Sequence, residues 1–169
     1  MLTRSHSALV RVAPAALLSV LAATAVAPAA HADVSKKVIA AFKGKLLVSA
    51  APLESGGDDK VTIADWKKHT QTSITGHQNG NDVQEWTFNY TAFLSKTGAS
   101  TLKLEFYDGA KYSADRTLTG VDPKDPVIEG DITIDEDEGL TKGKTYTLKV
   151  VASIKGKDTT VAQAVLTMN

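Results

Sequence analysis

The feature that most constrains the fold is a run of alternating apolar and polar residues near the C-terminus. Its apolar positions recur at every second residue: Tyr146, Leu148, Val150, Ala152 and Ile154. The positions between them are polar, with Val151 as the one exception. This period of two is typical of a β-strand with one buried face, because successive side chains of a strand point to opposite sides. A helix would scatter the same residues around its circumference.

Other stretches of the chain carry the same alternation. The most aromatic of them follows the turn pair Asn79-Gly80 and places five apolar residues on one face: Trp86, Phe88, Tyr90, Ala92 and Leu94. Two further runs place Leu102, Leu104 and Phe106, and then Ile128, Ile132 and Ile134, on single faces. Asn79-Gly80 is a strong turn signal, because both residues tolerate positive φ.

Glycine- and proline-containing turns separate these runs, so the sequence predicts an all-β fold, an antiparallel β-sandwich of seven to eight strands. Three local predictions are less direct. The segment before Leu46 reads as a short helix or an edge strand, and Val61 to Gly76 as a partly exposed strand. Asp108-Gly109-Ala110 is expected to form a three-residue hairpin loop, since this register keeps Phe106 and Leu104 on the buried face.

The turn that precedes the C-terminal run adds a resemblance. The stretch LTKGKTYTLKVVA, from Leu140 to Ala152, resembles the leucine-x-proline-glycine and tyrosine-x-x-x-valine-x-alanine pattern of fibronectin type III domains. Lys142 stands where that family usually has proline. The resemblance implies an immunoglobulin-like sandwich in which the Tyr146 hydroxyl bonds to the backbone of the turn, as a tyrosine corner. It concerns architecture and implies no activity.

The N-terminus has the features of a secretory signal peptide. Arg4 and Arg11 precede a largely apolar run from Ala13 to Ala30. The run is followed by the small-residue pattern Ala30-His31-Ala32, so cleavage is predicted before Asp33. The alternative is a retained membrane anchor, but Pro14 and Pro28 interrupt the apolar run. The alanine-rich composition of this segment is typical of bacterial export signals. We therefore expect residues 1–32 to be a signal peptide and residues 33–169 to form a single domain, periplasmic or secreted, with no membrane span after cleavage.

Charge and cysteine content exclude some classes of function. Removal of Arg4 and Arg11 with the signal peptide would leave 17 basic residues against 19 acidic ones. This balance is too neutral for a nucleic-acid-binding protein that neutralises phosphates. The chain has no cysteine, so it folds without disulfides and carries no lipid on a cysteine.

An acidic stretch is the main candidate metal site, since His69 and His77 do not lie in a metal-binding spacing. Calcium takes six to eight oxygen ligands, and Asp135 and Asp137 lie in the run Asp135-Glu136-Asp137-Glu138, shortly after Asp131. The spacing does not fit an EF-hand loop. The alternative is a solvated turn that keeps the protein soluble.

Three aromatic residues are candidates for binding a partner through partly exposed rings: Trp66, Tyr107 and Tyr112. Exposed aromatics on a sandwich can stack on sugars or anchor a protein partner. Ordinary packing between the sheets is the alternative.

We expect an exported binding or cell-surface interaction module that is not an enzyme and carries no cofactor. Its partner would be a protein or a carbohydrate. Two other classes stay open, a small secreted enzyme or enzyme inhibitor and a calcium-stabilised structural module. The first would need a pocket with converging polar groups, and the second would need loops that gather carboxylates.

Overall fold

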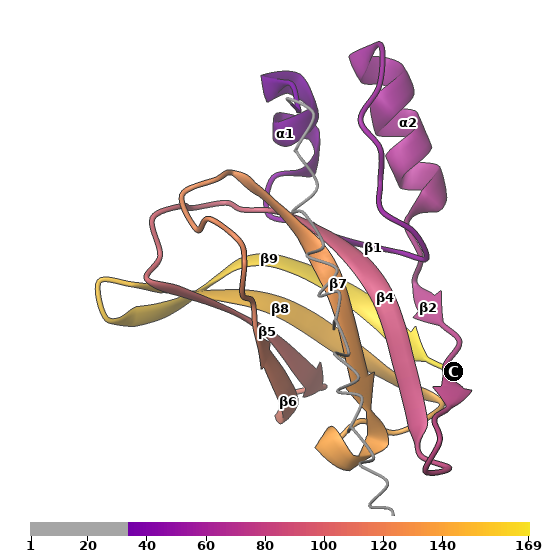
Figure 1. The fold of residues 1–169 in the computed structure, drawn as a ribbon. Coiled ribbons are helices and arrows are strands. Elements are labelled where there is room, and N and C mark those ends of the chain that lie inside the picture. Colours follow the sequence, from indigo (N-terminus) through magenta and orange to yellow (C-terminus); the bar gives the residue numbers. More distant parts are fainter. Residues whose placement is uncertain (1–33) are drawn as a thin grey trace, which may run out of the picture.

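A computed structural model describes residues 34–169, which form two β-sheets and two short α-helices (Figure 1). The predicted signal peptide lies outside the described residues. In chain order the elements are α1 (Lys36–Phe42), β1 (Leu46–Ser49), α2 (Asp59–His69), β2 (Ser73–Ile74), β3 (His77–Gln78), β4 (Gln84–Phe93), β5 (Thr101–Asp108), β6 (Lys111–Thr117), β7 (Val127–Asp135), the 3-10 helix η1 (Glu136–Glu138), β8 (Lys144–Ile154) and β9 (Lys157–Met168). The predicted all-β character is confirmed, but the described residues form nine strands instead of the expected seven to eight, because β2 and β3 are short pairings of two residues each.

The larger sheet has five strands in the order β2-β9-β8-β5-β6. Every pairing in it is antiparallel except that of the short β2 with β9. The alternating run that begins at Tyr146 is β8, which pairs along its whole length with β9 on one side and with β5 on the other. The strand with the clearest sequence pattern is thus the central strand of this sheet.

The smaller sheet has four strands and is built on β4. β1 and β3 pair with one side of β4, and β7 pairs with the other side in a nine-residue ladder from Glu85↔Asp135 to Phe93↔Val127. The two sheets face each other (Figure 1). A parallel bridge between Lys45 and Gln163 joins them next to β1. The chain is therefore a β-sandwich in its coarse architecture.

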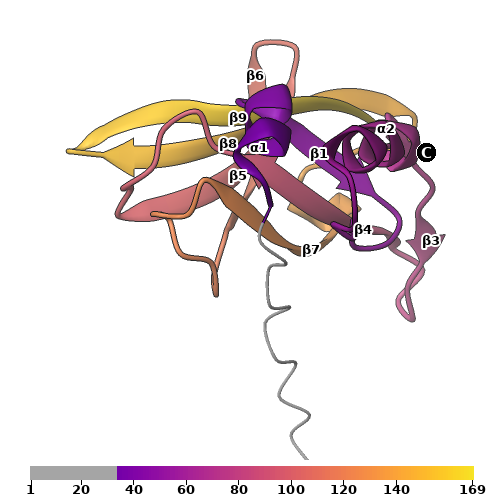
Figure 2. The same ribbon diagram turned by 90° about the horizontal axis from the view of Figure 1, so that it is seen from above.

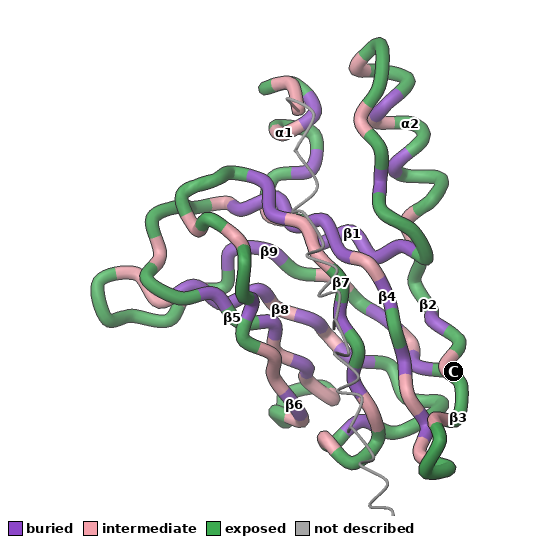
Figure 3. Tube along the Cα trace, in the orientation of Figure 1, coloured by how far each residue is buried: buried purple, intermediate pink, exposed green. Residues whose placement is uncertain are grey.

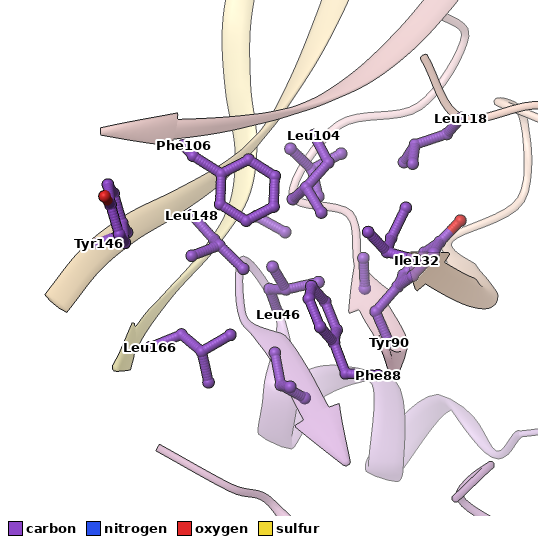
Figure 4. Close-up of a cluster of buried hydrophobic side chains, with 14 of the residues drawn as sticks. Leu46, Phe88, Tyr90, Leu104, Phe106, Leu118, Ile132, Tyr146, Leu148 and Leu166 are labelled. Carbon is purple, nitrogen blue, oxygen red and sulfur yellow. The ribbon is translucent and has the colours of Figure 1, made fainter. Parts of the chain in front are cut away.

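The predicted inward faces meet in the main core. Phe88 and Tyr90 of the four-stranded sheet point toward Leu104, Phe106 and Leu148 of the five-stranded sheet (Figure 4). These side chains are buried, and buried positions alternate with exposed ones along the strands (Figure 3). Removing this much apolar surface from water is the main favourable term in folding. The residues alternate in the sequence because every second side chain of a strand is buried against the opposite sheet.

Gly130 breaks the isoleucine alternation of β7 for a packing reason. It lies opposite Tyr90 in the ladder, and a Cβ at Gly130 would come 2.8 to 3.0 Å from the hydroxyl oxygen and two ring carbons of Tyr90. The Tyr90 ring therefore occupies the space that any larger residue at position 130 would need. Burial, aided by the nearby Asp131 and Glu129 carboxylates, raises the pKa of Tyr90 to about 12.

The two helices lie over one end of the sandwich, next to β1, and cover a second, smaller core (Figure 2). Its members come from α1, α2, the loop before α2 and the four-stranded sheet: Val38, Phe42, Leu47, Leu53, Trp66, Phe93 and Val127. Leu47 and Phe93 alternate with residues that face the main core, so β1 and the C-terminal end of β4 are buried on both sides. The Ser35 hydroxyl, which caps α1, also donates to Asp59 at the start of α2 at 2.6 Å.

The partly exposed strand predicted from Val61 onward is wrong, because α2 occupies most of that segment. Asp58 is the N-cap of the helix, and its carboxylate accepts a hydrogen bond from the Lys60 N–H at 2.7 Å. Thr62 and Trp66, four residues apart, form the buried stripe. The stripe is too narrow to give a clear helical period, while the aspartate cap is the signal that favours a helix. The open alternative at residues 36–42 resolves as the helix α1.

Candidate functional site

The β5–β6 hairpin places both candidate tyrosines on the outer face of the five-stranded sheet. Its loop has two residues, with Asp108 opposite Lys111 and Gly109 at φ 61°, so the predicted three-residue loop is wrong. The register shifts after the Tyr107↔Tyr112 pair, which leaves Ser113 as an extra residue and sets Phe106 opposite Ala114. This β-bulge keeps Phe106 in the core while both tyrosines point outward.

The two tyrosine rings contact each other edge to face. Their centroids lie 6.0 Å apart at an interplanar angle of 81°, and the Lys149 Nζ lies 3.9 Å from the Tyr107 centroid. Edge-to-face aromatic pairs and a cation over a ring are both favourable arrangements. The contacts restrain Tyr107, whereas Tyr112 keeps 48% of its surface exposed.

Both hydroxyls donate to carboxylates on the same face. Tyr107 donates to Glu105 at 2.7 Å, and Tyr112 donates to Asp115. These bonds hold the phenolic protons, so the Glu105 contact raises the pKa of Tyr107 and the Asp115 contact raises the pKa of Tyr112 to about 12. The Tyr112 hydrogen bond in turn lowers the pKa of Asp115, helped by Lys103 at 3.2 Å. Both hydroxyls thus keep their protons and can donate over the physiological range.

The tyrosines belong to one row of side chains that crosses four strands. Tyr112 lies opposite Tyr107, Tyr107 opposite Thr147, and Thr147 opposite Val165. Only three large hydrophobic side chains are exposed in residues 34–169, and two of them, Tyr112 and Val165, end this row. The third, Val61, lies on α2. We call the surface formed by Tyr107, Tyr112, Thr147, Lys149 and Val165 the tyrosine face.

The third aromatic candidate, Trp66, is not on the surface. Its side chain is fully buried in the second core, with ring centroids 5.9 Å from Phe42 and 5.7 Å from Phe93. Its indole N–H donates to the Glu54 carbonyl oxygen at 2.9 Å. The polar neighbours that made Trp66 look exposed are the solvent side of α2, so its predicted role as an interaction residue is corrected.

The acidic candidates lie at the end of β7. Asp135 is the last residue of that strand and Asp137 is exposed on η1. Neighbouring carboxylates have protein partners, since Glu138 pairs with Arg116 and Glu136 accepts from the Lys142 N–H at 3.3 Å. In the part of the chain that the structure describes, no group of three or more histidine, cysteine or acidic side chains is arranged to hold a metal ion. Calcium binding at Asp135 and Asp137 stays a prediction.

Tyr146 lies near the start of β8, next to the turn that precedes this strand. It is 1% exposed, and its hydroxyl accepts a hydrogen bond from the Thr141 N–H at 2.9 Å. The phenol therefore satisfies a backbone donor of the turn five residues upstream. This is the contact that a tyrosine corner makes.

No pattern in the sequence singles out Lys149, Thr147 or Val165. Each lies on the polar side of its strand, and the face they share with the tyrosines depends on the register of three separate strand pairings.

Neither α-helix in residues 34–169 is long and apolar enough to cross a membrane. No protein-family model matches the sequence, and no curated protein matches it.

Proposed function

We propose that this protein is an exported, non-catalytic binding module with an immunoglobulin-like fold, and that it binds its partner through the tyrosine face. The observation that carries the proposal is the exposure of Tyr112 and Val165 at the two ends of one cross-strand row. Exposed apolar side chains set among polar ones mark interaction sites on folded proteins. Aromatic anchors held in one orientation lose little conformational entropy on binding.

Two observations support the immunoglobulin-like fold. β9, β8 and β5 are adjacent, as strands G, F and C are in that fold, and β1, β4 and β7 lie together, as A, B and E do. Tyr146 makes its backbone contact at the start of β8, which takes the place of strand F. Export rests on the predicted signal peptide alone.

Co-sedimentation with whole cells of the source organism tests the function. The labelled protein should pellet with the cells, and Tyr112→Ser should abolish the association. Val61→Ser is the matched control, because it removes an apolar side chain of comparable exposure from α2 instead of the tyrosine face. Each variant is first shown to unfold at the same urea concentration as the wild type. Equal pelleting of Tyr112→Ser and wild type, or no pelleting of either, would overturn the proposal.

A further inference from the structure

The strands beneath the tyrosine face determine how a ligand can be recognised there. β5 and β8, which carry Tyr107, Thr147 and Lys149, are paired on both sides. Their backbone donors and acceptors are engaged in the sheet, so an extended peptide cannot add a strand at β5 or β8. The outer edge of β6, the strand that carries Tyr112, has no strand partner in residues 34–169. Recognition on the face itself, between the edges of the sheet, has to use side chains. Three interstrand spacings separate Tyr112 from Val165, about 14 Å, so a ligand that contacts both lies across the strands.

The charges that border the row are balanced. On the same face, Lys103 lies 3.2 Å from Asp115. Glu105 accepts a hydrogen bond from the Tyr107 hydroxyl, and the Lys149 ammonium lies over the ring of the same tyrosine. Two lysines thus stand against two carboxylates around the row, so these four groups offer no net charge to steer or hold an ionic ligand. The occupant that matches such a surface is uncharged.

The polar groups around Tyr112 suit a ligand rich in hydroxyl groups. Carboxylates accept hydrogen bonds, the Lys149 ammonium donates them, and Thr147 and the exposed Gln163 amide do both. A sugar hydroxyl can also do both, while the C–H side of a pyranose ring is apolar and can cover the exposed Tyr112 ring. Aromatic side chains with one apolar face and one polar end are well suited to such a ligand.

We infer that the tyrosine face binds a neutral polysaccharide chain laid across β6, β5, β8 and β9, with Tyr112 as its stacking platform. The inference rests on the proposed function and names the chemistry of its partner. Lys149, held over Tyr107, and Gln163, opposite Lys149 in the ladder, are the side chains placed to donate to the sugar hydroxyls.

Affinity gel electrophoresis tests the inference with named neutral polymers: hydroxyethyl cellulose, galactomannan, glycol chitin and dextran. At least one should retard the wild-type protein, and retardation should persist at high salt because no net charge is involved. Tyr112→Ser should weaken binding by about tenfold or more, while Tyr112→Phe, which keeps the ring, should retain it. Val165→Ser should weaken binding independently, and Val61→Ser should leave it unchanged.

Three outcomes would overturn the inference: retardation by none of the four polymers, binding of Tyr112→Ser equal to wild type, or salt-sensitive retardation by the anionic polymer alginate alone. Protease treatment of the cells used in the sedimentation experiment separates this failure from that of the proposed function. If Tyr112-dependent pelleting disappears after proteolysis, the partner is a protein. The binding function then stands, and the polysaccharide inference falls.

Discussion

Gly130 sets the packing between β4 and β7, because Tyr90 fills the space of its absent side chain. Gly130→Ala should destabilise the protein by about 1–3 kcal/mol, since the new methyl group forces the buried Tyr90 ring to move. Urea unfolding gives the change in free energy. Gly56→Ala is the control, because a Cβ there meets nothing within 4 Å. A cost for Gly130→Ala no larger than that of Gly56→Ala would contradict the packing account.

The Tyr112–Asp115 contact can be tested by titration. Tyr112 holds its proton more tightly in the folded state, with a pKa of about 12, so its contribution to stability is complete below pH 10 and is lost as the pH rises toward 12. Asp115→Asn removes the carboxylate that causes this shift. Absorbance of tyrosinate should then show one tyrosine ionising nearer pH 10.

Asp108→Asn is the matched control for that titration. Asp108 is a carboxylate of the same hairpin that pairs with Lys144, and it makes no contribution to the raised pKa of Tyr112. The control variant should therefore reproduce the wild-type curve. An unchanged curve for Asp115→Asn would show that the phenol has no carboxylate partner in solution.

Among the elements, α2 depends on one side chain. Trp66 is fully buried against Phe42 and Phe93, so Trp66→Ala should cost about 3–5 kcal/mol in urea unfolding. Val61 lies on the same helix at 63% exposure, and Val61→Ser should change the free energy by about 0.5 kcal/mol or less. Similar costs for the two variants would mean that the helix is not held to the sheet through Trp66.

The elements also show which parts of the fold the sequence could predict. β4 and β8 could be predicted because each buries one face against the opposite sheet along nearly its whole length. α2 was missed because its buried stripe is so narrow, and the hairpin loop was misassigned because a bulge near Ser113 restores the register that a two-residue loop would otherwise shift. Bulges follow from tertiary pairing and leave little trace in the sequence.

The candidate site also contains residues that the sequence could predict and residues that it could not. Tyr107 could be proposed from sequence because it stands outside the buried alternation of β5, whereas the outward direction of Tyr112 depends on the two-residue loop and the bulge. Lys149 and Val165 could not, since their neighbours on the face come from strands that are distant in the chain. Trp66 was misplaced because its neighbours in sequence are polar while its neighbours in space are Phe42 and Phe93. Local pattern predicts which way a side chain points within a strand, but non-local register decides what it points toward.

For the whole molecule, the question is whether the helical layer and the sandwich unfold together. The two cores share strands, because Leu47, Phe93 and Val127 of the second core alternate along the chain with residues of the main core. The helices therefore cannot leave without exposing the apolar side chains of Leu47, Phe93 and Val127. Such sharing should make residues 34–169 unfold in a single cooperative transition.

The two tryptophans of the sequence allow a direct test of this cooperativity, since Trp66 lies in the second core and Trp86 in the main core. In Trp86→Phe the fluorescence reports on Trp66, and in Trp66→Phe it reports on Trp86. Within each variant, the urea midpoint from fluorescence should coincide with the midpoint from far-ultraviolet circular dichroism. Comparison inside one variant removes the difference in stability between variants. If Trp66 becomes exposed at a lower urea concentration than the sheets unfold, the helical layer is a separate unfolding unit, and the shared strands do not couple the two cores.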